Sequence, residues 1–290
     1  MEIVCPNCDF KREVDDSLIP SKKTIVHCKA CGCRFSLRKA RSIGVILSKG
    51  GVGKTTTSVS LAAGLSMRGK RVLLVDTDTQ GQAAYMLGVS PKAGLTELVT
   101  KELGPDETIF QAREKLWLLA GGKSLAGIKR FVDRKDFGGE LTLTETLSPL
   151  ENRFDYIIVD SSPGWDPLTV NVLFYVNELL APVSLEVMSL QGLSEFMKSL
   201  GSIRKYRRDV MLNYILPTFM DSRVKNPGEI LASMKKVYPE NLLEPIRYCI
   251  RLSEAPAYGK TIFEYAGGSI GASDYMALVD KILKDEDNID

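Results

Sequence analysis

The sequence predicts an α/β fold, with a doubly wound and mostly parallel sheet, preceded by a small β ribbon. Three apolar runs, at residues 43–47, 71–76 and 155–160, have the length and composition of buried strands. Five of the six cysteines lie near the N-terminus, between Cys5 and Cys33. At 290 residues and 44% hydrophobic composition the chain can bury a full core beside such an appendage. We therefore expect two domains, at residues 1–38 and 39–290.

Composition excludes several classes of protein. No run approaches the roughly 18 to 20 apolar residues that cross a bilayer, and the N-terminus lacks the basic-then-apolar layout of a secretory signal. We therefore expect a cytoplasmic protein. The net charge of +2 identifies no partner, but residues 1–41 hold nine Lys or Arg against five Asp or Glu. The remainder holds 29 basic against 31 acidic residues, so the basic excess lies in the ribbon.

Four cysteines form two CxxC knuckles, Cys5 with Cys8 and Cys28 with Cys31, separated by nineteen residues. This spacing is typical of four-cysteine zinc sites, and the missing export signal favours a metal over disulfides. Each knuckle can aim two thiolates at one tetrahedral ion, and residues 22–27 are expected to form one arm of a hairpin. Below about 40 residues a chain has too little core to fold alone, so zinc would supply folding energy.

The pattern is similar to that of bacterial zinc-ribbon modules. The similarity includes CPxC, the Val-Asp to Ile-Pro stretch at residues 14–20, and CxxCGxxF at residues 28–35. His27 and Cys33 flank the second knuckle and are interpreted as bystanders. Because four cysteines leave no open coordination position, we expect a structural or docking zinc rather than a catalytic one. After the ribbon, residues 36–41 are expected to form a short basic linker.

Residues 48–57 read SKGGVGKTTT and lie between the apolar run 43–47 and a helical pattern. Strand, glycine loop and helix are the context that a phosphate-binding P-loop requires. Its backbone N–H groups would surround phosphate oxygens, Lys54 would reach the β and γ phosphates, and Thr55 would give its hydroxyl to Mg²⁺. The expected nucleotide-binding residues are Lys49, Gly50, Gly51, Val52, Gly53, Lys54, Thr55 and Thr56. The larger domain is thus predicted to be a P-loop NTPase.

Carboxylates end the other two apolar runs. Asp160 follows its run in the layout of a Walker B strand, which favours magnesium coordination over a solvated strand end. Asp76 and Asp78 alternate along the end of the run 71–76, so only one of them can easily face the phosphates. The expected magnesium ligands are Thr55, Asp76 and Asp160.

The glycine loop departs from the general P-loop pattern, since Ser48 stands at the first glycine and Lys49 beside it. KGGVGKTT is the deviant Walker A motif of the ParA/MinD family, which the chain resembles further along. Residues 76–82 resemble that family's DxDPQGN segment, with Thr79 for proline and Gln82 for asparagine. Further matches lie at residues 181–193, 220–223 and 251–256.

The resemblance implies a magnesium-dependent ATPase that cycles between a monomer and an ATP-bound homodimer. In that family the lysine at the position of Lys49 reaches across the dimer to the partner's nucleotide. By the same resemblance Asp78 would orient the attacking water and Asp76 would lie nearer the magnesium ion. The implied catalytic residues are therefore Lys49, Lys54 and Asp78.

Residues 161–169 resemble the family's TPPxxGxLT switch, with Ser162 in place of a proline and Asp166 in place of a glycine. Both changes bear on the geometry of the switch. Beyond it, the sequence predicts a strand at residues 210–216 and a closing helix at residues 274–283. Trp117 and Trp165 are expected to be packing or switch residues.

What the switch controls is open between two interpretations. In the first, the ATP dimer binds nonspecific DNA for chromosome or plasmid partitioning, a ParB-like partner stimulates hydrolysis, and the protein associates with the nucleoid. Arg247 and Arg251 are then the expected DNA contacts, although Tyr248 stands where the family often has a basic residue. Residues 204–208 are a further basic candidate, and residues 265–272 lack the family's lysines. In the second interpretation, the ATPase positions a protein cargo through its ribbon without binding DNA.

Other outputs fit less well. A MinD-like membrane switch would need a basic amphipathic C-terminal helix, whereas residues 281–290 end in an acidic tail, so we expect no membrane partner. A cluster-carrying ATPase would need paired cysteines outside the ribbon, and Cys249 stands alone there and is expected to be a small core residue. A scaffold without hydrolysis is the remaining alternative, and the presence of both lysines and both aspartates of the motif argues against it.

Overall fold

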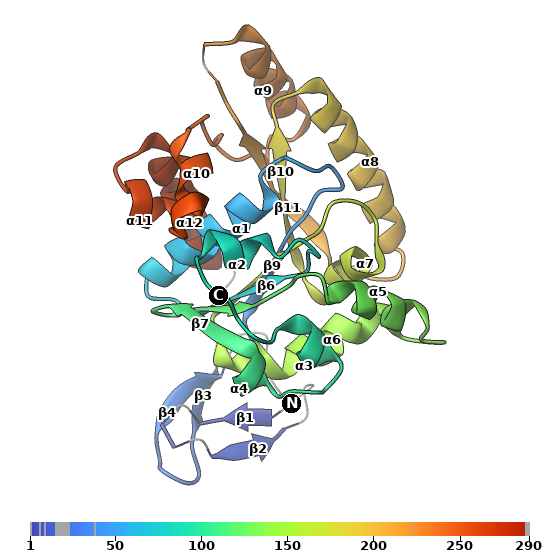
Figure 1. The fold of residues 1–290 in the computed structure, drawn as a ribbon, viewed down its shortest axis with the longest axis vertical. Coiled ribbons are helices and arrows are strands. Elements are labelled where there is room, and N and C mark those ends of the chain that lie inside the picture. The colour runs from blue at the N-terminus through green and yellow to red at the C-terminus, as the bar shows by residue number, and fades with distance from the viewer. Residues whose placement is uncertain are drawn as a thin grey trace.

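The computed structural model describes residues 2–5, 7, 8, 10–14, 24–37, 39–221 and 223–287 (Figure 1). The Val-Asp to Ile-Pro stretch beyond residue 14, residues 22 and 23 of the expected hairpin arm, and Ser222 lie outside the described residues.

A seven-stranded sheet forms the centre of the larger domain. Its strand order is β11-β10-β5-β9-β6-β8-β7, and all neighbours are parallel except β7 and β8. The strands are β5 (Arg41–Val45), β6 (Val72–Asp76), β7 (Ile109–Arg113), β8 (Leu116–Leu119), β9 (Tyr156–Asp160), β10 (Glu178–Ser184) and β11 (Met211–Thr218). The predicted doubly wound, mostly parallel sheet is confirmed. The first strand begins at Arg41 rather than residue 43, and Ile46 and Leu47 are buried in the loop that follows it.

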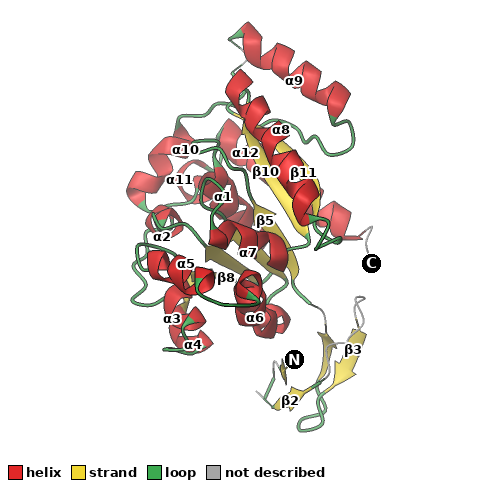
Figure 2. Cartoon of the chain, turned by 90° about the vertical axis from the view of Figure 1, so that its right-hand side faces the viewer, coloured by secondary structure: helices red, strands yellow, loops and turns green. Residues whose placement is uncertain are grey.

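Helices cover both faces of this sheet (Figure 2). One face carries α1 (Lys54–Met67), α2 (Gln82–Met86), α11 (Ile262–Ala266) and α12 (Ile270–Asp287). The other carries α3 (Leu95–Val99), α5 (Leu125–Asp133), α6 (Thr142–Leu147), η3 (Ser148–Arg153), α7 (Pro167–Tyr175), α8 (Val187–Ile203) and α9 (Lys225–Val237). The remaining short elements are α4 (Pro105–Thr108), η2 (Gly139–Leu141), α10 (Arg251–Glu254) and η4 (Ala255–Tyr258).

The apolar strands supply both halves of the core. In β6, Val72 and Leu74 face the α1 side, whereas Leu73 and Val75 face the α7 side. All four side chains are fully buried. A parallel strand covered on both faces needs apolar residues at every position, which is why these strands read as continuous hydrophobic runs.

The ribbon consists of two small antiparallel hairpins (Figure 1). They are β1 (Glu2–Val4) with β2 (Lys11–Glu13), and β3 (Thr24–His27) with β4 (Arg34–Leu37). The expected hairpin arm is confirmed over the described residues. The expected linker at residues 36–41 is wrong at both ends, because Ser36 belongs to β4 and Arg41 to β5.

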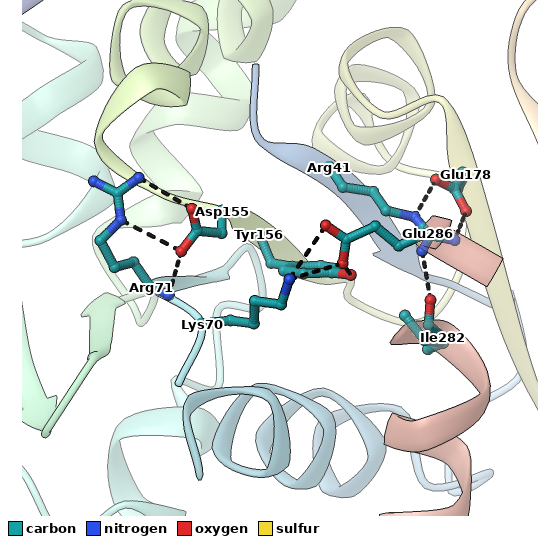
Figure 3. Close-up of polar contacts among 8 residues, drawn as sticks. All are labelled: Arg41, Lys70, Arg71, Asp155, Tyr156, Glu178, Ile282 and Glu286. Carbon is teal, nitrogen blue, oxygen red and sulfur yellow. Dashed lines mark hydrogen bonds and ion pairs between the residues drawn. The ribbon is translucent and has the colours of Figure 1, made fainter. Parts of the chain in front are cut away.

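Arg41 anchors the start of the larger domain (Figure 3). Its guanidinium donates to both carboxylate oxygens of Glu178 at 2.6 Å, to the carbonyl of Ile282 at 2.7 Å and to the hydroxyl of Tyr214 at 2.7 Å. The side chain is 6% exposed. Because Ile282 belongs to α12, this one arginine ties the first strand to the last helix.

The end of α12 is held in the same place. Glu286 is 4% exposed and accepts hydrogen bonds from the Tyr156 hydroxyl and, at 3.1 Å, from Lys70 (Figure 3). Asp285 accepts from Tyr214 at 3.0 Å and from Lys281 at 2.6 Å. Asp285 and Glu286 of the acidic tail are therefore held against the domain, and residues 288–290 lie outside the described residues.

We expect Arg41→Met to lower the free energy of unfolding by about 3 to 5 kcal/mol, because it leaves a nearly buried carboxylate without its partner. The matched control is Arg68→Met, which removes the ion pair between Arg68 and Asp280 of α12, whose side chains are 45% and 52% exposed. That exposed pair should be worth only about 0 to 1 kcal/mol. Urea unfolding measures both, and equal losses would contradict a stabilising role for the Arg41 cluster.

Candidate nucleotide-binding site and zinc centre

The glycine loop joins β5 to α1 at the carboxyl end of the sheet. Gly51 and Gly53 adopt φ values of 75° and 90°, which side chains with a Cβ rarely tolerate. Val52 is fully buried, and its carbonyl accepts a hydrogen bond from Thr218 at 3.0 Å. The loop is thus held in a curved form, and the N–H groups of the first turn of α1, beginning at Lys54, have no acceptors within the helix. This arrangement suits anionic phosphate groups.

Lys54 lies inside the loop. Its side chain is buried, and its Nζ donates to the Lys49 carbonyl at 2.7 Å. Burial lowers the pKa of Lys54, and the charges of Asp160 and Asp78 partly oppose that effect. A buried ammonium near the loop centre is placed to interact with phosphate charge.

Asp160 and Asp76 lie side by side, since they are register partners at the ends of β9 and β6. Both are fully buried. Burial raises the pKa of Asp160 to about 6 in spite of hydrogen bonds from Thr55 and Ser58. For Asp76, burial first and then the charge of Asp160 raise the pKa to about 8. Two adjacent buried carboxylates favour protonation or a bound cation.

The oxygens of these carboxylates differ in their partners. Asp160 Oδ1 accepts from Ser58 at 2.8 Å, but its buried Oδ2 has no hydrogen-bond partner among the described residues. Asp76 accepts the N–H groups of Asp78 at 2.8 Å and Ala83 at 3.2 Å, one on each oxygen. An unpaired buried carboxylate oxygen near a threonine fits Mg²⁺, which takes oxygen ligands. The residues present therefore fit the ion, with Asp160 and Thr55 better placed than Asp76.

Asp78 lies half-buried in the turn after β6. Its Oδ1 accepts the Gln80 N–H at 3.0 Å, and its carbonyl accepts the N–H groups of Gly81 at 3.1 Å and Gly122 at 3.0 Å. Three backbone N–H groups thus donate to Asp78 and hold this turn, and the third, that of Gly122, belongs to the loop after β8.

Lys49 lies at the rim of the loop. Its Nζ is 3.8 Å from Glu186 Oε2, in an ion pair whose side chains are 31% and 70% exposed. The first residues of α8, Val187 and Met188, are 65% and 63% exposed beside Glu186. Lys49 therefore has a weak partner within its own chain and lies beside an exposed apolar surface.

The loop before α7 contacts the glycine loop. Gly164 donates its N–H to the Ser48 carbonyl at 2.8 Å, and a Cβ added to Gly50 would lie 3.8 Å from Pro163. The two departures from the family's switch pattern contact each other, because Ser162 donates to Asp166 at 2.8 Å.

Asp166 also caps α7 by accepting the Thr169 N–H at 2.8 Å, and it pairs with Lys129 of α5. Burial alone would raise the pKa of Asp166, but these hydrogen bonds, led by that of Lys129, hold it below its usual value. Trp165 is 40% exposed and stacks on Phe196, with ring centroids 5.7 Å apart. The other tryptophan, Trp117, packs against Phe154 at 5.5 Å.

A hollow of about 280 Å³ opens beside the start of α1 and is mostly apolar. Its lining residues are Gly53, Thr56, Thr218, Phe219, Ile246, Arg247, Tyr248, Cys249, Leu252, Ser253 and Tyr275. Asp221 and Arg223 line an adjoining hollow rather than this one. Phe219 adopts φ of 57°, a strained conformation for an aromatic residue, which often marks a functional site. Cys249 was expected in the core but is half-buried and lines both hollows.

Several site residues carried no signal in the sequence. Ser58 lies one helical turn after Lys54, just past the end of the glycine-loop motif. Lys129 is far from the switch along the chain, and only packing brings it to Asp166. Phe219 and Gly122 belong to loops whose conformation the apolar pattern does not report.

The two CxxC knuckles meet between the hairpins. The Sγ atoms of Cys5, Cys8, Cys28 and Cys31 all lie within 4.8 Å of one another, with Cys8 and Cys28 3.6 Å apart and Cys5 and Cys31 3.7 Å apart. Zinc–sulfur bonds of about 2.3 Å in a tetrahedron separate the sulfurs by about 3.8 Å, so the cluster fits a zinc ion. Cys33 and His27 are not part of the cluster, as expected.

We expect the purified protein to carry one zinc ion, because a ribbon with so little core depends on its metal. Cys31→Ser should lower the zinc content measured by atomic absorption, whereas Cys33→Ser, the matched control, should not. Chelation should speed amide exchange in the hairpins while ADP affinity of the larger domain is kept. Full zinc content in Cys31→Ser would contradict the four-cysteine site.

The fold and the site define a P-loop NTPase with a zinc ribbon, and comparisons with known proteins agree. A family model described as an AAA domain matches residues 40–212, and a zinc-ribbon domain model matches residues 1–36. The chain is 34% identical over 247 residues to the sporulation initiation inhibitor protein Soj of Bacillus subtilis, covering 83% of this chain and 97% of Soj. It is 32% identical to the chromosome partitioning protein ParA of Myxococcus xanthus, covering 84% and 88%.

Solved structures share the fold. Cobyrinic acid a,c-diamide synthase from Mycobacterium smegmatis, with bound ADP and magnesium, superposes with a TM-score of 0.73 at 28% identity, covering 84% of this chain and 94% of that one. A variant of McdA from Cyanothece, in its complex with ATP, gives 0.75 at 23% identity, covering 85% and 97%. The chain belongs to the ParA/MinD family of ATPases, and its zinc-ribbon segment brings four cysteines together where they could hold a metal ion. Among the described helices, none is long and apolar enough to cross a bilayer.

Proposed function

We propose that the chain is an ATP-dependent dimerisation switch, which hydrolyses ATP to ADP and phosphate to partition DNA or position another cargo in the cell. The observation that carries the proposal is the placement of the two loop lysines. Lys54 is buried within the nucleotide loop, whereas Lys49 lies half-exposed at its rim with only a 3.8 Å ion pair. The partitioning functions named for the relatives support the cellular role.

In this proposal each residue has a separate task. Lys54 and the N–H groups of the first turn of α1 bind the β and γ phosphates. Asp160, Thr55 and Asp76 would hold Mg²⁺, which would neutralise phosphate charge when bound. Asp78 orients the attacking water from the turn after β6. Lys49 enters the site of the second subunit and stabilises charge there during phosphoryl transfer, as an arginine finger does.

We expect Lys49→Ala to keep ADP affinity and to lose ATP-dependent dimerisation and turnover. A residue that acts as an arginine finger contributes roughly 10³-fold or more to kcat, so kcat should fall by about that factor. Lys198→Ala on the exposed face of α8 is the matched control. Steady-state kinetics and sedimentation with ATP measure the two effects, and wild-type turnover in Lys49→Ala would rule out the role of this lysine.

We propose nonspecific DNA as the first candidate partner, through Arg247 and Arg251. Their side chains are 50% and 54% exposed, but each pairs with a carboxylate, Asp274 at 2.6 Å and Glu254 at 2.8 Å. The segment 204–208 offers exposed basic residues around Tyr206, which is 83% exposed. Phosphate contacts from such residues would dominate DNA affinity. A ParB-like protein would then stimulate hydrolysis, and the protein would lie on the nucleoid.

The ion pairs of Arg247 and Arg251 favour a second candidate, a protein cargo bound through the ribbon. Both arginines are already neutralised by neighbouring carboxylates, so DNA phosphates would have to displace those partners. The ribbon holds most of the chain's basic excess and offers the exposed Phe10 and Ile25.

Binding to duplex DNA across a salt series separates the candidates. In the DNA interpretation, the Asp78→Ala variant should bind duplex DNA when ATP is present and should not bind it when ADP is present instead. The affinity for DNA should fall steeply as the salt concentration rises. Arg251→Ala should weaken it, whereas Arg153→Ala, which removes an arginine from another exposed ion pair, should not. If ATP drives dimerisation while DNA is not bound in any state, the cargo is a protein.

A further inference from the structure

The loop after β8, residues 120–122, lies directly against the turn that carries Asp78. A Cβ added to Gly121 would lie 2.7 Å from the Asp76 carbonyl oxygen, 2.8 Å from the Asp78 carbonyl oxygen and 2.9 Å from Asp76 Oδ1. The first two are backbone atoms, which cannot rotate away. No residue other than glycine fits at position 121 without displacing one of the two segments.

The contact is made by glycines on both sides. A Cβ added to Gly81 would lie 3.2 Å from the Gly122 Cα, and Gly122 itself has φ of 130°. Its N–H donates to the Asp78 carbonyl at 3.0 Å. The two loops therefore approach each other backbone to backbone, with one hydrogen bond across the contact.

Residues 120–122 are held on their other side by the sheet and by two helices. β8 pairs with β6 over all four of its residues, and the Ala120 carbonyl accepts the Leu95 N–H at 2.9 Å. The Gly122 carbonyl accepts the Leu125 N–H at 3.0 Å, at the start of α5. Gln80, in the Asp78 turn, is exposed, whereas residues 120–122 are all half-buried. Crowding at the contact should therefore displace the Asp78 turn at least in part.

We propose that Gly121 and Gly122 are positioning residues for ATP hydrolysis: their backbone forms a platform that sets the position of Asp78. The inference rests on the proposed role of Asp78 in orienting water. The platform acts through Asp78 and leaves the glycine loop of residues 48–54 untouched. It therefore governs kcat rather than nucleotide affinity. Because a misplacement of about 1 Å can cost roughly 10²-fold in rate, displacements of several tenths of an ångström should be measurable.

The test compares Gly121→Ala with Gly127→Ala in the full-length protein. Gly127 lies in α5, and an added Cβ there would have no neighbour within 4 Å, so it is the matched control. Gly121→Ala should lower kcat by roughly tenfold or more, with ADP affinity unchanged. Gly127→Ala should keep wild-type kcat. Wild-type kcat in Gly121→Ala, or equal loss of kcat and ADP affinity, would overturn the inference.

Two further variants separate positioning from general damage. Gly81→Ala crowds the same contact less severely, because its added Cβ would lie 3.2 Å from the Gly122 Cα. It should lower kcat by a smaller factor, so it gives a result even if Gly121→Ala does not fold. In the background of Asp78→Ala, adding Gly121→Ala should lower kcat no further, because its effect passes through the missing carboxylate. Additive losses would overturn the inference. If Asp78→Ala alone kept wild-type kcat, the role proposed for Asp78 would fail instead.

Discussion

Asp76 and Asp160 end adjacent parallel strands in register, so their carboxylates are buried next to each other at one edge of the sheet. Parallel strands present their carboxyl ends on the same edge, which makes this juxtaposition a consequence of topology. Burial raises the pKa of both groups, and the charge of Asp160 raises that of Asp76 further. Ser58, the buried Lys54 and backbone N–H groups partly offset this, and the unpaired Asp160 Oδ2 is left for a cation. The nucleotide site thus depends on the two buried carboxylates of Asp76 and Asp160, whose proximity is unfavourable without a bound cation.

The same constraint explains the glycine contact behind the site. Asp76 is satisfied by the N–H groups of Asp78 and Ala83, so the chain must turn tightly around the carboxylate. The turn then lies too close to the loop after β8 for a side chain at Gly121. Burial of the Asp76 carboxylate therefore dictates the position of the half-buried Asp78 two residues later. In this way a feature of the core determines the geometry of the proposed catalytic group.

At the opposite edge of the sheet, Arg41 and Glu286 hold the last helix, α12, against the strands. Arg41 of β5 donates to the Ile282 carbonyl of α12, and Glu286 of α12 accepts from Tyr156 of β9. Arg41 follows the ribbon within four residues of β4, so the zinc module is attached at the point where the first strand and α12 are tied together. The start of α12 reaches the apolar hollow beside α1 through Tyr275, and its end reaches Arg41. One helix thus spans from the nucleotide site to the root of the ribbon.

The sequence alone determined the apolar strands, the glycine loop, Asp160 and the four cysteines, because local pattern and motif spacing encode these directly. It also placed Asp76, Asp78 and Lys49 by resemblance to the ParA/MinD family. Only the tertiary structure decided the contacts between distant segments. Lys129 meets Asp166, Gly121 meets the Asp78 turn, and Arg41 meets Glu178 across 137 positions of sequence. Such contacts depend on packing and register over the whole sheet, which no local pattern records.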